Sequence, residues 1–273
     1  MKNILYVEEP PITSYPVIAN VLSILWPKKD VVLPWISDHF IQLIMRPNYP
    51  YTTADFYDNA DIDNYNCLIY NCPFLKWMKN NCYTINGTQF TDYIEYIINQ
   101  GYYLEANLDH YYFTSSLYYD QKHFVHPTFI YGYDNDKQII YTSDFYYGKG
   151  YIRQPISYSN INLSLNNDYI INLYGYQDAE YKFNFELMNT YLEDYLFSRD
   201  SMKKFVFSHQ EYNHNIICGL SYYDYLASEI CKGEWVDIRA FHVLYDHKKI
   251  MNIRLGYLKD ILKSRKIYFD FHR

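Results

Sequence analysis

The sequence predicts an α+β fold, with a helix-and-sheet half followed by a helical region. Three short strand patterns follow one another between Gly101 and Asp144, with polar turns between them. Two helical patterns precede this strand block, and beyond about residue 180 the long patterns are helical. We therefore expect a helix-and-sheet half over residues 1–180 and a helical region over residues 181–273 that packs on it.

The first residues read as a strand, and the first helix is expected to follow closely. Ser14 and Pro16 precede the apolar run VIANVLSIL, and a serine N-cap followed by proline in the first turn is a common helix start. The pair Trp26-Pro27 is expected to end this helix, because proline disfavours helical backbone at the residue before it.

The next stretch has weaker patterns. Val31–Met45 is apolar and predicts a strand or a short helix, and residues 46–66, rich in Pro, Asn, Asp and Tyr, predict a long surface loop. Phe74–Asn80 is expected to form a helical turn. Thr88–Gln100 predicts a helix with one apolar face, and Gly101 follows it as a C-cap.

The strand block carries the most informative residues. His126 opens the strand that runs PTFIYGY, the chain turns through Asp134–Asp136, and the next strand, QIIYTSDF, ends on Asp144. Because the two strands form an antiparallel pair, we expect His126 and Asp144 to lie side by side. Ile170–Tyr176 predicts one more strand.

The last part of the chain predicts helices. Their expected ranges are Phe183–Ser198, Ile216–Lys232 and Val236–Lys266. Gly219 weakens the second helix, and Gly233 is expected to close it.

Composition narrows the classes of function. The 273 residues carry a formal net charge of −7 without a basic block, which argues against a nucleic-acid partner. No apolar run approaches the roughly 18 residues that a membrane helix needs, so we expect a cytoplasmic protein that does not bind membranes. The five cysteines include no CxxC pair, so the sequence indicates neither a zinc site nor a redox dithiol. We expect no metal and no cofactor.

His126 and Asp144 are the candidate catalytic pair. A histidine acts as a general base when a carboxylate orients its second ring nitrogen, and the predicted hairpin places such a carboxylate beside His126. Either residue alone is more often structural, because aspartate also ends strands and caps turns.

The nucleophile is less clearly indicated. Ser14 and Tyr15 stand at the start of the first helix, where a helix dipole favours an anionic nucleophile, yet Ser14 also fits a plain N-cap. Cys72, in the sequence NCPFL, is an alternative nucleophile on another loop or a buried thiol.

Two further groups are candidates for substrate binding. Tyr111 and Tyr112 flank the strand block, where they either wall a cleft or pack across strands. Arg239, His242 and Asp246 are three and four residues apart, so they share one face of the last helix. That face either holds a carboxylate or phosphate or is a solvated face with paired charges.

The runs TSYPVIANVLSIL and HFVHPTFIYGYDNDKQIIYTSDF, with the C-terminal ICGLSYYDYLASEI, resemble the butirosin biosynthesis protein H N-terminal-like family. The resemblance implies a papain-like fold related to bacteriocin-processing cysteine peptidases. It also implies a cysteine at the first helix start, followed by a catalytic histidine and aspartate. His126 and Asp144 match the latter two, and Tyr15, beside Ser14, occupies the cysteine position.

The resemblance implies a role in peptide natural-product biosynthesis of the nonribosomal type. The substrate would be an acyl, aminoacyl or peptidyl group, free or bound to a carrier protein, and the reaction acyl transfer, cyclisation or hydrolysis with His126 as base. The alternative is a catalytically inactive relative, with a degenerate triad, that serves as an accessory subunit binding a carrier protein or acyl ligand. A homodimer that uses the helical region as its interface is a third interpretation.

Overall fold

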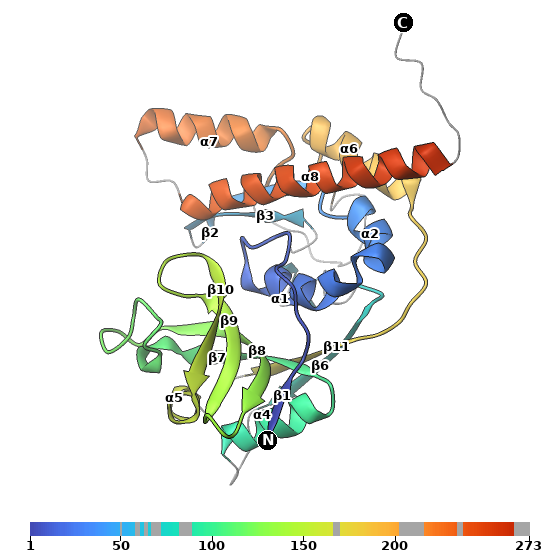
Figure 1. The fold of residues 1–273 in the computed structure, drawn as a ribbon. Coiled ribbons are helices and arrows are strands. Elements are labelled where there is room, and N and C mark those ends of the chain that lie inside the picture. Colours follow the sequence, from blue (N-terminus) through green and yellow to red (C-terminus); the bar gives the residue numbers. More distant parts are fainter. Residues whose placement is uncertain are drawn as a thin grey trace, which may run out of the picture. The chain divides into compact units, whose positions relative to one another are not determined.

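The computed structural model of the chain forms two compact units (Figure 1). It describes residues 1–49, 51–57, 61–62, 65–66, 72–81, 89–165, 170–201, 216–233 and 237–264. The first unit combines residues 1–27 with 72–179, and the second combines residues 28–71 with 180–273. Both units contain helices and antiparallel strands, which confirms the α+β class. Residues 28–71 thus belong to the same unit as the C-terminal region, whereas the sequence predicted that residues 1–180 group together.

One antiparallel sheet is the frame of the first unit. Its strand order is β10-β9-β8-β7-β11-β6, and β1 pairs with the last residues of β8. The strands are β1 (Lys2–Ile4), β6 (Leu75–Asn81), β7 (Tyr103–Asp109), β8 (Val125–Asp134), β9 (Ile139–Phe145), β10 (Tyr151–Ser157) and β11 (Ile170–Tyr176). The strand block predicted over residues 101–144 is therefore the centre of this sheet.

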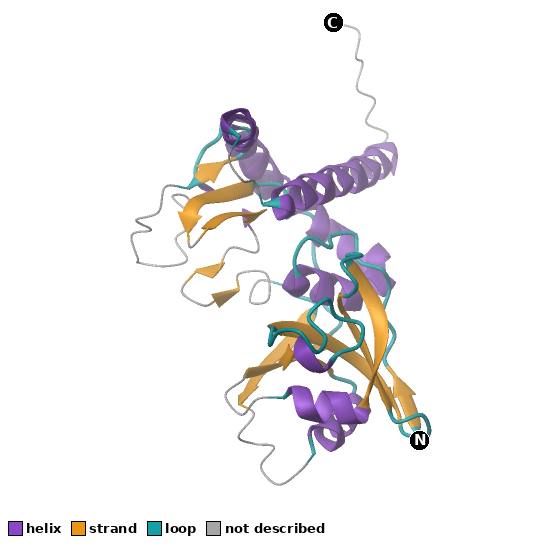
Figure 2. Ribbon diagram, turned by 90° about the vertical axis from the view of Figure 1, so that its left-hand side faces the viewer, coloured by secondary structure: helices purple, strands orange, loops and turns teal. Residues whose placement is uncertain are grey.

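Helices cover both faces of this sheet (Figure 2). On β7, Glu105 accepts a hydrogen bond from Asn20 of α1 (Pro16–Leu25), whereas its neighbours Leu104 and Ala106 share a core with α4 (Phe90–Asn99). Because successive side chains on a strand point to opposite faces, α1 and α4 lie on opposite sides of the sheet. The short helices η4 (His110–Tyr112) and α5 (Tyr158–Ser164) pack against each other, and Ile161 of α5 joins the α4 core.

In the first unit, the starts and ends of the two long predicted helices are close to those observed. Helix α1 begins at Pro16, and its N-cap is the extended residue Tyr15 rather than Ser14. Helix α4 matches the predicted helix, and Gly101 follows it with a φ of 82°, a conformation that glycine adopts without strain.

The second unit has a small sheet as well as helices. Its three-stranded sheet has the order β12-β2-β3. The elements are α2 (Lys29–Asp38), β2 (Leu43–Tyr49), β3 (Tyr51–Phe56), β4 (Asp61–Ile62), β5 (Tyr65–Asn66), α6 (Phe185–Leu196), β12 (Ile217–Cys218), α7 (Ser221–Lys232) and α8 (Ile238–Ser264), and η1 (Trp26–Lys28) precedes α2. Trp35, Phe40 and Phe56 are fully buried in it, and their rings make edge-to-face contacts.

Several sequence predictions for this region were wrong. Residues 46–66 were expected to be a loop, but β2 and β3 form a hairpin there. The helical turn expected over Phe74–Asn80 is wrong, because the residues from Leu75 onward form β6 and pair with β11. The helix expected from Ile216 starts only at Ser221, since Ile217 and Cys218 pair with β2. Across the described parts of the chain, no helix has the length and apolar character needed to cross a membrane.

Candidate functional site

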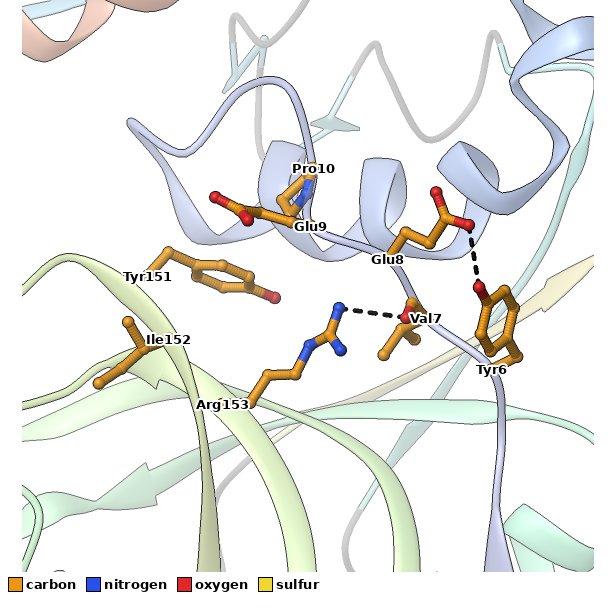
Figure 3. Close-up of a pocket in the computed structure, with 8 residues that line it drawn as sticks. All are labelled: Tyr6, Val7, Glu8, Glu9, Pro10, Tyr151, Ile152 and Arg153. Atoms are coloured by element: carbon orange, nitrogen blue, oxygen red, sulfur yellow. Dashed lines mark hydrogen bonds between the residues drawn. The ribbon is translucent and has the colours of Figure 1, made fainter.

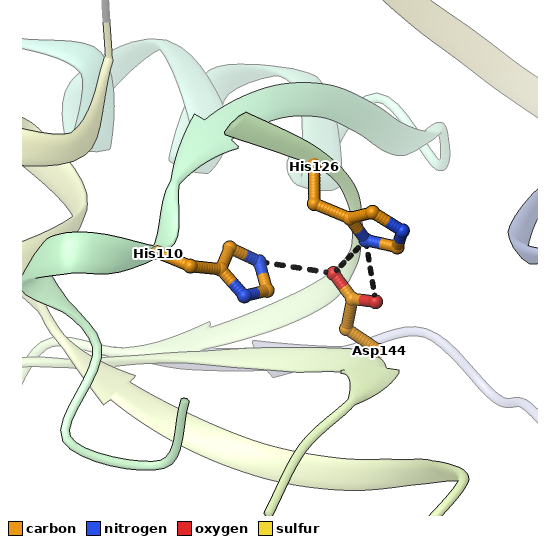
Figure 4. Close-up of side chains that lie close together, drawn as sticks. All are labelled: His110, His126 and Asp144. Atoms are coloured by element: carbon orange, nitrogen blue, oxygen red, sulfur yellow. Dashed lines mark hydrogen bonds and ion pairs between the residues drawn. The ribbon is translucent and has the colours of Figure 1, made fainter. Parts of the chain in front are cut away.

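The structure brings His126 and Asp144 together, as the hairpin predicted (Figure 4). His126 is the second residue of β8, and Asp144 is the residue before the last of β9. The Nδ1 atom of His126 lies 2.9 Å from Oδ1 and 3.1 Å from Oδ2 of Asp144. The expected proximity of the two side chains is therefore confirmed.

The strand register explains this contact. Phe129 pairs with Ser143, so the next residues, Thr128 and Asp144, project together on the face of the sheet that α4 covers. The Thr128 hydroxyl donates a hydrogen bond of 3.0 Å to Oδ2 of Asp144. His126, two residues before Thr128, projects on the same face and reaches the same carboxylate.

A second histidine, His110, belongs to the same cluster. Its Nε2 atom lies 3.1 Å from Oδ2 of Asp144 and 3.0 Å from Oγ1 of Thr128, and the residue is only 2% exposed. The backbone amide of His110 donates to the carbonyl of Phe124, which fixes the turn after β7 beside the start of β8. Sequence reasoning selected His126 alone. The signal for His110 was its place directly after the strand that pairs with the His126 strand.

Hydrogen bonding sets the charge of Asp144, which is fully buried. Burial alone would raise the pKa of its carboxyl, but hydrogen bonds and attraction from His110 and His126 hold that pKa below its ordinary value. Because a carboxylate only accepts hydrogen bonds, Nδ1 of His126 carries the proton in this pair. In the neutral ring, Nε2 therefore has a lone pair that is able to accept a proton.

Aromatic rings contact the ring of His126, which is partly exposed. Its side chain is 23% exposed. The ring of Phe124 stacks on it with centroids 5.5 Å apart, and that of Phe145 meets it edge-on at 6.2 Å. Tyr118 in turn stacks on Phe124 at 4.2 Å. His126 thus lies at the opening of an otherwise buried cluster, with an apolar wall beside it.

The same three side chains have the composition of a transition-metal site. One ligand atom from each of His110, His126 and Asp144 lies within 4.8 Å of the others. Imidazole and carboxylate groups bind Zn²⁺ at about 2.0–2.2 Å, so the cluster is able to hold such an ion after a small rearrangement. The sequence had predicted no metal ligand here. The hydrogen bonds to Asp144 also satisfy these atoms without a metal.

The predicted nucleophiles lie in the first unit. Ser14 is buried, and the partly buried Tyr15 is the N-cap residue of α1. Cys72 is buried as well, and this burial raises the pKa of its thiol to about 12. A thiol with that pKa stays protonated near neutral pH, which argues against Cys72 as a nucleophile. Cys67 and Cys82 lie outside the described residues.

The side chains of Tyr111 and Tyr112, which were predicted to bind substrate, contact other residues of the chain. The Tyr111 hydroxyl donates to Asp120 at 2.8 Å, and its ring stacks on His123 at 4.3 Å. Tyr112 packs against the core that α4 shares with the sheet. Of the tyrosines in this part of the chain, Tyr118 has the contact with the wall around His126.

The residues predicted on the last helix belong to the second unit. The guanidinium of Arg239 donates to Asp237, two residues earlier, and His242 is exposed. Asp246 is buried, so Arg239, His242 and Asp246 do not form one solvated face.

No protein-family model matches the chain, and a comparison with curated proteins gives no match.

Proposed function

We propose that the chain is an enzyme of papain-like type that processes acyl or aminoacyl groups in peptide natural-product biosynthesis of the nonribosomal type. His126 is the general base, and Asp144 orients it. The reaction is the transfer of an acyl group to water or an amine, which includes cyclisation when the amine belongs to the same substrate. The substrate is free or carried by a carrier protein.

The observation that carries the proposal is the pairing of Nδ1 of His126 with the buried carboxylate of Asp144. This pairing fixes the ring and leaves Nε2 as the basic nitrogen. The negative charge of Asp144 also stabilises the imidazolium that forms when His126 takes up a proton. A structural histidine needs a hydrogen-bond partner but has no need of this partial exposure.

The proposed step involves no covalent bond to the protein. Nε2 of His126 removes a proton from the attacking water or amine as that nucleophile adds to the acyl carbonyl. The bond from the acyl carbon to its leaving group then breaks, and His126 returns the proton to the departing thiolate or alkoxide. Such a mechanism suits a chain in which Tyr15 stands where the resemblance places a cysteine.

The test compares His126 with His123, which lies three residues earlier in the chain. We would measure thiol release from acyl and aminoacyl N-acetylcysteamine thioesters by the wild type, His126→Gln and His123→Gln. His123 is a matched control because it also pairs with a carboxylate, Asp109, but its side chain is 67% exposed. We expect His126→Gln to lower turnover by at least about 100-fold and His123→Gln to leave it nearly unchanged. Equal turnover in the wild type and His126→Gln, with both folded, would refute the base role.

A binding subunit is the second candidate function. Two observations support a binding role. Burial favours the protonated Cys72 thiol, and position 15 holds a tyrosine, so neither residue supplies the thiolate of a cysteine enzyme. This candidate predicts no turnover of any thioester by the wild type, together with saturable binding of an acylated carrier protein. Repeating the turnover assay with a chelator, and with added Zn²⁺, separates both candidates from metal-dependent hydrolysis.

A further inference from the structure

An open pocket lies on the first unit, between the N-terminal segment and the edge strand β10 (Figure 3). Its volume is about 620 Å³. The lining residues are Tyr6, Val7, Glu8, Glu9, Pro10, Tyr151, Ile152 and Arg153. The pocket is large enough for a small acyl group and combines aromatic, acidic and basic side chains.

Opposite charges line this pocket without neutralising each other. Arg153 makes one hydrogen bond among the described residues, from Nη2 to the carbonyl of Val7 at 3.1 Å. The carboxylate of Glu8 accepts from the Tyr6 hydroxyl at 3.0 Å. Within the described parts of the chain, the Glu9 carboxylate has neither a hydrogen bond nor an ion pair, and Glu9 lines the same pocket as Arg153. A ligand with one cationic and one oxygen-bearing group complements these side chains.

A buried polar network supports one wall of the pocket. The Tyr151 hydroxyl donates to the side-chain oxygen of Asn20 at 2.7 Å, and the Asn20 amide donates to Glu105. Asn172 and Tyr174 also donate to Glu105, which is only 5% exposed. Buried polar groups are costly unless all are hydrogen-bonded, so this network holds Tyr151 in one position. The pocket wall is therefore fixed before any ligand binds.

The pocket adjoins the His126 site at the end of the strands. Ile152 pairs directly with Asp144 across β10 and β9. The ring of Phe145 contacts Tyr151 at 5.8 Å on one side and His126 at 6.2 Å on the other. Tyr151 and Arg153 project on the α1 face of the sheet and Asp144 on the other face, so Phe145 stands where the two sites meet.

We infer that this pocket binds the amine-bearing end of an acyl substrate. The substrate ammonium lies against Glu9, and the carbonyl oxygen of the amine-bearing residue, which is not the reacting acyl carbonyl, accepts a hydrogen bond from Arg153. The inference rests on the proposed function only in identifying the ligand as the substrate of His126. The pocket then selects peptidyl groups with a free amino end over simple acyl groups, because only the former carry the cation.

A matched pair of unreactive ligands tests the inference. Alaninamide and propionamide differ in the ammonium group alone, and we would titrate each into the ¹⁵N-labelled full-length chain while recording backbone amide shifts. We expect alaninamide to shift the amides of Tyr151, Ile152 and Arg153 saturably, and propionamide to shift them weakly. Glu9→Gln should weaken alaninamide binding about tenfold and leave propionamide unaffected. Asp92 is an exposed residue in the first turn of α4, so Asp92→Asn removes one negative charge away from the pocket and serves as the control.

Each possible result of these titrations either supports or contradicts the pocket assignment. Any of three results would overturn the inference. The two ligands could bind equally, Asp92→Asn could lose as much alaninamide binding as Glu9→Gln, or the amides of Tyr151–Arg153 could show no saturable shift. The measurement needs no turnover. If His126→Gln shows that His126 is not a base while alaninamide binding still depends on Glu9, the pocket assignment stands and the catalytic proposal fails.

Discussion

The two units each bury basic side chains, but these side chains have different partners. In the first unit, His110 and His126 both hydrogen-bond to the side chain of Asp144. In the second unit, Nε2 of His247 hydrogen-bonds to the backbone carbonyl of Ile41 at 2.9 Å, and Nε of Arg254 donates to the carbonyl of Ser37 at 2.8 Å. One cluster is built on a group that ionises, and the other on groups that do not.

This difference separates a candidate site from a structural one. A carbonyl at a helix end needs a donor, and Arg254 supplies it for the carbonyls of Ser37 and His39, which end α2. His247 is fully buried, so no ligand reaches it. His126, by contrast, is partly exposed and its carboxylate partner gives the ring a defined basic nitrogen. The second unit also has a histidine on a buried carboxylate, because Nδ1 of His39, whose side chain is 14% exposed, lies 2.7 Å from Oδ1 of Asp38. What distinguishes the first unit is that a second histidine, His110, shares the carboxylate with His126.

Substitution of Asp144 is expected to have the largest effect. Asp144→Ala leaves four donors without this acceptor, namely His110, His126, Thr128 and the backbone amide of Phe145, which costs roughly 3 kcal/mol or more of folding stability. Asp144→Asn keeps the shape but offers an amide, so His126 loses the negative charge and its fixed tautomer. We expect turnover to fall by at least about 100-fold in this variant while most of the stability is retained.

Urea unfolding and thioester turnover measure the two effects of the Asp144 substitutions separately. If Asp144→Asn kept full turnover, the carboxylate would have the same structural role as the carbonyls around Arg254. The contrast between the two units would then disappear.

The second prediction concerns pH and the structural histidine of the second unit. Burial lowers the pKa of His247 from its ordinary value of 6.5 to about 4, and the charges of Lys248 and Arg254 act in the same direction. The unfolded chain therefore binds a proton at His247 at a higher pH than the folded chain does. This contribution to stability is complete above about pH 6.5 and is lost as the pH falls toward 4, by roughly 3 kcal/mol in all.

Urea unfolding of the full-length wild type and of His247→Gln across this pH range checks the prediction for His247. His247→Gln retains a donor for the Ile41 carbonyl and removes the titration, so its pH dependence should be flatter between pH 6.5 and 4. Equal pH dependence in the two proteins would show that other groups cause the acid destabilisation.

Local patterns explain which parts of the fold the sequence predicted. Helix α4 has its own apolar face and a glycine at its end, and β8 and β9 are joined by a turn rich in aspartate and asparagine. In contrast, β6 is a strand because it pairs with β11, about 90 residues later in the chain. The two lysines of β6, Lys76 and Lys79, resemble those of an exposed turn, and a distant partner leaves no local signal.

The residues of the candidate site also divide into those that local sequence patterns predicted and those that depend on distant contacts. His126 and Asp144 were predicted because one hairpin joins them. His110 was missed because its contact depends on the turn after β7 and on the carbonyl of Phe124 that receives its amide. The pocket residues Glu9 and Arg153 were not predicted either, since β10 was not recognised as a strand beside β9.

The smallest expected effect is that of His110, which we treat as a positioning residue. His110→Leu removes one of the donors that hold Asp144 below its ordinary pKa, but Thr128 and His126 still bind the carboxylate. We expect turnover to fall about tenfold with KM nearly unchanged, because His110 acts on Asp144 and does not touch the substrate. His110→Gln retains an amide donor near the same place and should restore most of the turnover. Equal losses in the Leu and Gln variants would instead mean that the imidazole of His110 takes part in the reaction or holds a metal, which added Zn²⁺ would reveal in the wild type alone.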